Sequence, residues 1–330
     1  AYEIRNCDWS SDVCSSDLKY LLRLDAVDTQ GSIVKDAWAH WNFMADATTV
    51  GLRMGQGKSG FGLEATGAED GLYFVDRSAA SRTFSDQRSR GAWLFGSHSE
   101  NRLRWNAGLQ NGDVAAASTG LEGGEEDANT DNELNFVANA SFDPMGDTTG
   151  GKGGESIRQG DFGDVKDLKG TIGAGVEIGN GKGTGALTGP DIDTTSININ
   201  TAWMFGGGLS AQGEIFLRTD DPQGAAAAQD STGWYAMLTY TMPKAGNSDM
   251  QWGFGVRVNQ ISRDDATTFI NTGAGTNAKG DVTEFSAVVD AFYHGHACKT
   301  QVEYTWQNIN PDVGSDTTNN ILRVQFQLLF

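Results

Sequence analysis

The sequence predicts an all-β fold, a transmembrane antiparallel β-barrel, from three observations. Apolar and polar residues alternate along many segments of about ten residues, a length and a period typical of membrane-spanning strands. The connections between these segments are alternately long and short, as expected when the two rims of a barrel face different compartments. No stretch approaches the roughly 20 consecutive apolar residues of a membrane-spanning helix. The 330 residues include 44 glycines and only 5 prolines, which favours tight turns over linkers.

The alternation is clearest at the C-terminal end, in ILRVQFQLLF at residues 321–330. Every second residue from Leu322 to Phe330 is apolar, and the polar residues Arg323, Gln325 and Gln327 stand between them. A last strand of this kind resembles the signal read by the machinery that assembles outer-membrane barrels, so we expect Phe330 to engage that machinery. Roughly fourteen such segments are predicted, near 19–28, 33–43, 48–57, 88–97, 102–111, 132–142, 168–179, 194–205, 209–219, 233–242, 250–262, 281–294, 297–308 and 319–330.

The lengths of the connections distinguish a barrel from a soluble lectin-like sandwich, which would also contain alternating strands. Residues 310–318 and 263–280 are long connections, whereas 295–296 and 206–208 are tight turns. One connection breaks the rule, because residues 143–167 are long where a short turn is due. The Gly-rich, acidic composition of that insertion gives no physical reason for its length. A sandwich would require the apolar rows to be buried and the molecule to dissolve without detergent.

The first 18 residues are not predicted to belong to the barrel. DWSSDVCSSDL, at residues 8–18, resembles the in-frame translation of a short-read sequencing adapter, so we interpret residues 1–18 as a non-native segment. The barrel is then expected to occupy residues 19–330. Any signal peptide and the true N-terminus would then have preceded the present chain.

The charge of the chain limits its partners. A formal net charge of -19 excludes nucleic acid, because a phosphate backbone would repel the whole molecule. The same charge is compatible with a membrane barrel, whose inner face is polar. Both signs of charge are predicted on that inner face, as in a water-filled pore whose local field selects ions. The residues are Arg53, Arg102, Arg104, Lys169, Arg218, Arg257, Lys299 and Arg323, beside Glu133, Glu177, Glu214, Glu284, Asp290 and Glu303.

One segment, MGQGKSGFGLEATGAEDGLYFVDRS at residues 54–78, resembles the characteristic segment of a known family, the phosphate-selective porins (porins O and P). Gly57, Gly60 and Asp76 depart from the pattern of that family, which usually has an aromatic residue, a proline and a glutamate there. The residues that carry the resemblance are Gly55, Gln56, Lys58, Phe61, Glu64, Phe74, Val75, Arg77 and Ser78.

The resemblance implies a sixteen-stranded porin of the outer membrane of a Gram-negative bacterium, usually trimeric. The visible strands would then lack the first two. It also implies that a loop around residues 59–87 folds inward, and that basic residues on it attract oxyanions such as phosphate. The expected constriction and anion-binding residues are Lys58, Arg77, Arg82, Arg88 and Arg53, and the expected pore-lining residues are Arg102, Arg104, Arg257, Lys299 and Arg323.

The sequence gives no motif for an enzyme or for a bound metal. GQGKS at 55–59 resembles a phosphate-binding loop, but Leu52 stands where that motif needs its first glycine. DANTDNE at 127–133 resembles the start of a calcium loop, but Asn132 occupies the position of the obligatory glycine. Outside the first 18 residues Cys298 is the one cysteine, and a single thiol forms neither a disulfide framework nor a metal cage. We therefore expect no enzymatic activity and no cofactor.

Two functions fit these observations. The first is an outer-membrane porin, a homotrimer in the lipid, through which small anions or other small solutes diffuse passively. The second is a barrel that conducts nothing and serves adhesion or the structure of the envelope, for which the long acidic loops would be suited.

Overall fold

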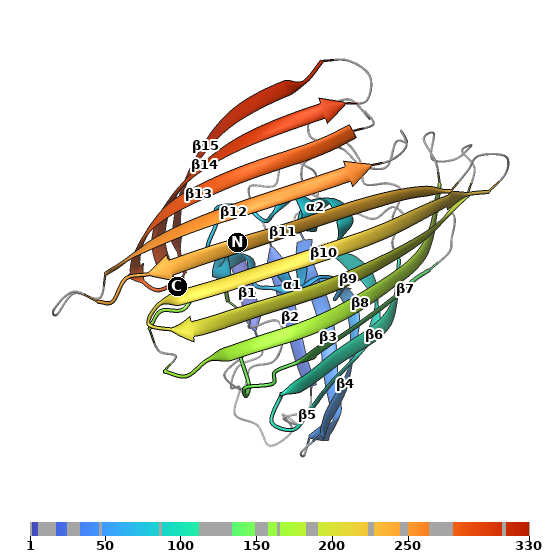
Figure 1. The fold of residues 1–330 in the computed structure, drawn as a ribbon. Helices are drawn as coiled ribbons and strands as arrows, with labels where there is room; N and C mark the ends of the chain where they lie inside the picture. Colours follow the sequence, from blue (N-terminus) through green and yellow to red (C-terminus); the bar gives the residue numbers. More distant parts are fainter. Residues whose placement is uncertain are drawn as a thin grey trace.

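The structure, a computed structural model, is one curved antiparallel sheet in which every strand pairs with its neighbours in sequence (Figure 1). It describes residues 2–5, 18–24, 34–45, 48–85, 88–111, 134–148, 158–163, 166–182, 191–223, 228–244, 250–263, 280–311 and 315–329. The strands in these ranges are β1 (Tyr2–Arg5), β2 (Leu18–Leu24), β3 (Val34–Ala45), β4 (Thr48–Gly57), β5 (Ser89–His98), β6 (Leu103–Asn111), β7 (Asn135–Phe142), β8 (Lys169–Lys182), β9 (Asp191–Gly206), β10 (Leu209–Pro222), β11 (Gln229–Thr241), β12 (Gln251–Arg263), β13 (Gly280–His294), β14 (Cys298–Pro311) and β15 (Thr317–Leu328). Two short helices, α1 (Leu63–Thr66) and α2 (Ala79–Phe84), and a 3-10 turn, η1 (Glu69–Gly71), lie in the connection between β4 and β5.

The prediction of an all-β antiparallel barrel with about fourteen strands is confirmed. The fourteen predicted segments correspond to β2 through β15. The fifteenth strand, β1, lies within the segment that we interpreted as non-native, and it pairs with β2 through Tyr2 and Leu24. Residues 6–17, which hold most of the adapter-like segment, and the terminal Phe330 lie outside the described residues. Among the described strands, β1 and β15 form the two edges of the sheet.

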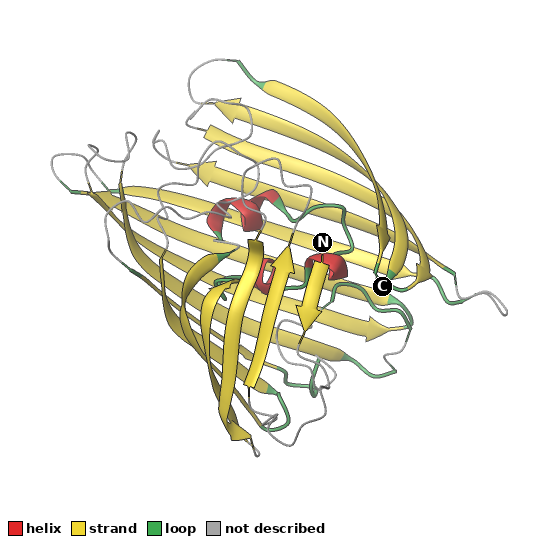
Figure 2. Ribbon diagram, turned by 180° about the vertical axis from the view of Figure 1, so that it is seen from behind, coloured by secondary structure: helices red, strands yellow, loops and turns green. Residues whose placement is uncertain are grey.

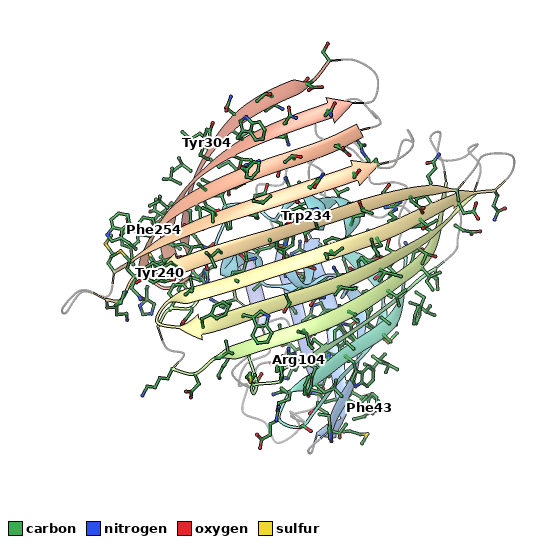
Figure 3. The ribbon with its side chains drawn as sticks, viewed as in Figure 1. Phe43, Arg104, Trp234, Tyr240, Phe254 and Tyr304 are labelled. Atoms are coloured by element: carbon green, nitrogen blue, oxygen red, sulfur yellow. The ribbon has the colours of Figure 1, made fainter. Side chains whose placement is uncertain are left out.

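The two faces of the sheet differ in polarity, because successive side chains of a strand point to opposite sides. In β11 the burial alternates strictly from Asp230 to Thr241, with apolar side chains such as Trp234 and Leu238 exposed. The outer face is therefore a broad apolar surface of the kind that lipid covers. Figure 3 shows side chains of this face, with Trp234, Tyr240, Phe254 and Tyr304 labelled.

The connections alternate as predicted. At one rim the turns are short, for example residues 207–208 between β9 and β10 and residues 295–297 between β13 and β14. At the other rim the connections are longer, including residues 58–88 between β4 and β5. The long connection between β7 and β8 lies at the short-turn rim, as the sequence indicated. No helix of the described residues is both long enough and apolar enough to cross a bilayer.

Candidate functional site

The connection between β4 and β5 folds back into the barrel, where Figure 2 shows its two helices inside the curved sheet. We call residues 58–85 the lumen segment. Gly60 and Gly62 begin it with φ angles of +84° and +81°, which turn the chain inward in a conformation that side chains disfavour. Ser78 caps the N-terminus of α2, since its hydroxyl accepts from the Ser81 N–H at 3.1 Å.

Buried aromatic residues attach the lumen segment to the inner wall. The rings of Phe61 and Phe84 pack against Phe216 of β10 at centroid distances of 6.1 and 5.7 Å, and the Phe84 pair is stacked. Phe74 lies under the guanidinium of Arg257, 4.3 Å from its ring centroid. Each buried phenylalanine contributes about 1.5–3 kcal/mol, so these contacts hold the lumen segment against β10 to β12.

A wall carboxylate binds the start of α1. Glu214 of β10 accepts hydrogen bonds from the backbone N–H groups of Leu63 and Glu64 at 2.8 and 2.7 Å. Its carboxylate also accepts from the hydroxyl of Tyr235 at 2.7 Å and from the side-chain amide of Asn198 at 3.0 Å. Four donors therefore converge on one buried side chain, which fixes the position of α1.

Glu64, one of the residues behind the family resemblance, ties α1 to α2. Its carboxylate accepts from the N–H and the hydroxyl of Ser78 at 2.8 and 2.7 Å. Glu64 is 2% exposed, and the guanidinium of Arg257 lies 3.8 Å from its carboxylate. The family resemblance pointed to Glu64, but the sequence does not predict its contacts with Ser78 and Arg257.

The strands β12 and β14 hold the middle of the lumen segment through its backbone. Asn259 accepts from the Ala80 N–H, and Glu303 accepts from the Val75 N–H, both at 2.9 Å. The Arg257 guanidinium donates to the carbonyl of Asp76 at 2.9 Å. Side chains of the wall therefore satisfy backbone groups that a short, irregular segment cannot pair by itself.

The structure places the predicted constriction residues next to acceptors within the lumen segment and the adjoining wall. Arg88 forms ion pairs with Asp36 of β3 at 3.0 Å and with Glu69 at 2.6 Å. Arg82 pairs with Asp76 at 2.9 Å.

Two further predicted constriction residues bind backbone carbonyls. Arg77 donates from Nε to the carbonyl of Glu64 at 3.1 Å. Lys58 donates to the carbonyls of Gly67 and Thr66. Both side chains therefore bind the backbone of α1 or of Gly67, the residue that follows it.

The remaining predicted constriction residue, Arg53, lies on the wall formed by β3 to β5. Its guanidinium stacks on the rings of Trp38 and Phe95 at 4.1 and 4.4 Å from their centroids. Arg53 is buried, and the two rings orient it within the wall.

Among the predicted pore-lining residues, Arg102 and Arg104 lie at the short-turn rim. Arg102 is in the turn before β6 and donates to the carbonyls of Asp143 and Pro144. Arg104 binds both carboxylate oxygens of Asp143 at 2.7 Å. These two residues therefore bind the start of the connection between β7 and β8.

The other predicted pore-lining residues lie on the inner face of β12, β14 and β15. Lys299 donates to the carbonyl of Leu72 at 2.6 Å. Arg257 and Arg323 approach the carboxylate of Glu303 at 3.3 and 3.8 Å, and the Arg323 side chain is the more exposed of the two. The structure brings Arg257 and Lys299 together with the lumen segment.

The open face of the lumen segment carries two carboxylates that are not among the predicted site residues. The side chains of Glu69 and Asp76 are 43% and 31% exposed, whereas those of their partners Arg88 and Arg82 are 1% and 8% exposed. In an ion pair the more exposed partner contributes more to the local field in the water. The sequence does not predict which partner of each ion pair is exposed, because that depends on which side chain faces the wall.

The acidity of Glu69 is set by its neighbours. Burial opposes its ionisation, but the positive charges of Arg88, Arg77 and Lys58 outweigh that effect and lower the pKa from 4.5 to about 2. Because the pKa of Glu69 is lower in the folded protein than in the unfolded chain, its ionised carboxylate stabilises the folded segment at pH values above the pKa of the unfolded chain. This stabilisation is lost as the pH falls through the pKa of the folded protein.

We expect the contact between Glu69 and Arg88 to weaken progressively below pH 4.5 and to be lost near pH 2. Amide hydrogen exchange of the lumen segment in detergent micelles, measured across that range, should accelerate as the pH falls after correction for intrinsic rates. In Glu69→Gln the acceleration should be smaller. An equal pH response in both proteins would assign the effect to another carboxylate.

The described residues contain no group of three His, Cys, Asp or Glu side chains placed to hold a metal ion. Cys298 is a free, half-buried thiol. His296, in the turn before β14, is held neutral, because burial and the charge of Lys299 lower its pKa to about 3.

Comparison with known proteins gives structural matches alone, because no family model and no curated protein matches the sequence. The outer-membrane channel DcaP of Acinetobacter baumannii superposes with a TM-score of 0.56 and 13% identity, over 93% of this chain and 78% of that one. OmpT, an outer-membrane protein of Vibrio cholerae, superposes in a form lacking loop L8 with a TM-score of 0.53 and 13% identity, over 94% and 85%. A trimer form of OmpT gives a TM-score of 0.51 and 12% identity, over 95% and 87%.

These similarities establish the fold. The chain has the architecture of outer-membrane β-barrels over almost its whole length. At such low identity the matches do not extend to the solutes or to the individual residues of those proteins.

Proposed function

We propose that this protein is a channel of the bacterial outer membrane through which small hydrophilic solutes diffuse passively. The observation that carries the proposal is a polar inner wall narrowed by a lumen segment, inside a sheet whose outer face is apolar. A barrel of this width is too wide for wall side chains to fill, so a segment attached to one wall narrows the lumen that remains. No chemistry on a bound substrate is required of these residues, and we propose no enzymatic activity.

Insertion in lipid is tested by a charge on the outer face. Val256, in the middle of β12, is 57% exposed on that face, and Val256→Arg is expected to destabilise the barrel in phospholipid vesicles by about 2–4 kcal/mol. Ser262→Arg, on the same face of β12 but near its end, is expected to cost about 0–1 kcal/mol. Denaturant unfolding in vesicles measures both. If both variants lose the same amount of stability, the outer face does not cross a bilayer, and the result would indicate a soluble protein.

Anion preference, with phosphate as one solute, is a narrower hypothesis within this function. It is supported by the family resemblance and by the basic residues Lys58, Arg77, Arg82 and Arg88 around the lumen segment. The exposed carboxylates of Glu69 and Asp76 act against it, because they lie beside the same arginines. Reversal potentials in a salt gradient decide the point, since a cation-selective potential contradicts the hypothesis.

We also propose a homotrimer as the assembled state. One apolar depression of about 820 Å³ crosses the outer face from β6 to β11, where small side chains such as Ala140, Ala174 and Gly213 leave room for another subunit. The trimer form of OmpT, a protein of the same fold, offers a precedent for that stoichiometry. The mass of the protein in micelles, determined by light scattering, tests the assembly.

The channel itself is tested by reconstitution into planar bilayers. Stepwise single-channel conductance supports the proposal, and block by added phosphate would support the narrower anion hypothesis. Stable insertion without conductance would instead support the alternative, a barrel with an adhesive or envelope-structural role.

A further inference from the structure

We infer that residues 158–163, in the connection between β7 and β8, form a second pore element, which enters the barrel from the short-turn rim and holds the lumen segment in place through Gln159. We call these residues the rim segment. The inference rests on the proposed channel function. A connection at this rim needs only a few residues, so the extra length between β7 and β8 requires an explanation.

The rim segment lies against the inner wall near the short-turn ends of several strands. The ring of Phe162 packs against Phe292 of β13 and against His296, at centroid distances of 4.8 and 5.0 Å. Gln251, at the start of β12, donates to the carbonyl of Phe162 at 3.2 Å. Gly208, in the turn before β10, donates its N–H to Asp161 at 3.1 Å. Three separate parts of the rim therefore fix this segment.

Gln159 connects the rim segment to the lumen segment through both its backbone and its side chain. Its N–H donates to the carbonyl of Gly71 at 2.9 Å. Its side-chain carbonyl accepts from the Tyr73 N–H at 2.8 Å, and its side-chain amide donates to the Glu64 carboxylate at 3.0 Å. On the other side, its backbone carbonyl lies 2.8 Å from Nε2 of His296.

This junction is buried. Gln159 is 6% exposed, and its partners Glu64 and Tyr73 are 2% and 0% exposed. Removing a hydrogen bond from a buried polar group costs the full free energy of that bond, because water cannot reach the group to replace the lost partner. Glu64 also binds Ser78 at the start of α2, so Gln159 supports both helices of the lumen segment.

The two segments therefore reach the same point from opposite rims of the barrel. The lumen segment follows β4 at the long-loop rim, and the rim segment follows β7 at the short-turn rim. The position of the lumen segment, and with it the free cross-section of the pore, depends on the rim segment as well as on the wall. Gln159 acts here as a positioning residue.

The test compares Gln159→Met with Arg158→Met in the full chain. Methionine at 159 keeps the approximate volume of glutamine and removes both side-chain hydrogen bonds. Arg158→Met is the matched control, because it removes a partly exposed ion pair between the same two segments, with Asp70, and leaves the side-chain hydrogen bonds of Gln159 in place. Amide exchange in the peptide that contains Tyr73 should become about tenfold faster in Gln159→Met and change little in Arg158→Met.

Single-channel recordings give the second measurement. Gln159→Met should raise the open-channel current noise, and combining it with Phe162→Ala should also raise the mean conductance. Unchanged exchange at Tyr73 would overturn the inference, whatever the currents. A parent protein without conductance would contradict the proposed channel, yet the exchange comparison would still decide whether Gln159 positions the lumen segment.

Discussion

Replacing Glu214 by leucine is expected to release α1 from the wall of the barrel and to increase the conductance of the pore about twofold. The carboxylate of Glu214 accepts from the backbone of Leu63 and of Glu64, and leucine offers no acceptor to either N–H. A buried donor without a partner costs about 1–3 kcal/mol, so the loss of both is enough to detach a helix of one turn. Single-channel recordings in planar bilayers measure the change.

Glu214→Gln is the control for this experiment. Glutamine has nearly the same volume but keeps only one acceptor oxygen, so it retains one of the two backbone contacts, and its conductance should lie between those of the parent protein and of Glu214→Leu. The secondary structure and thermal unfolding of both variants in micelles should resemble those of the parent, because the wall strands keep their ladders. A Glu214→Leu protein with parental conductance would mean that the aromatic contacts alone hold the lumen segment.

The second large effect is expected at the short-turn rim, where Arg104 binds Asp143. Arg104→Met leaves a fully buried carboxylate without its bidentate partner, which costs about 3–5 kcal/mol. Burial opposes ionisation of Asp143, but hydrogen bonds from Arg104 and Thr148 prevail and lower its pKa. The midpoint of urea unfolding in micelles should therefore fall, and the connection between β7 and β8 should become more accessible to protease.

A double-mutant cycle separates the ion pair from general packing. Asp143→Asn removes the charge, so adding it to Arg104→Met should recover part of the lost stability. If the double variant is as unstable as the sum of the two single variants, the pair is not coupled, and the stability depends on other contacts of each side chain.

The sequence was sufficient for the strands because their information is local. In β12, for example, Trp252 and Val256 alternate with Gln251 and Arg257. This alternation is enough to predict which side chains face outward and which face inward. The lengths of the turns could be predicted for the same reason, because they follow from the spacing between consecutive strands. The β1 strand was not predicted, because its four residues are too few for a pattern and precede an adapter-like segment.

The functional site was predicted less completely, because its geometry depends on pairs that are far apart in sequence. Lys58, Arg77 and Arg88 are recognisable as charged residues near a lumen, but their carboxylate and carbonyl partners are not. Asp36, for example, precedes Arg88 by 52 residues. The anion-binding role assigned to these residues stays a prediction. The role of Gln159 could not be predicted, since an uncharged residue in an unexplained insertion gives no signal.

The attachment of the lumen segment also bears on how the chain folds. Its hydrogen bonds span 150 residues from Glu64 to Glu214 and 228 residues from Val75 to Glu303. Contacts so distant in sequence close large loops and form slowly. The wall residues that bind the segment belong to β10, β12 and β14, so the segment can take its final position only after these strands have formed. The C-terminal half of the chain therefore serves as the template on which an earlier-synthesised segment acquires its structure, and folding of the pore runs opposite to the direction of synthesis.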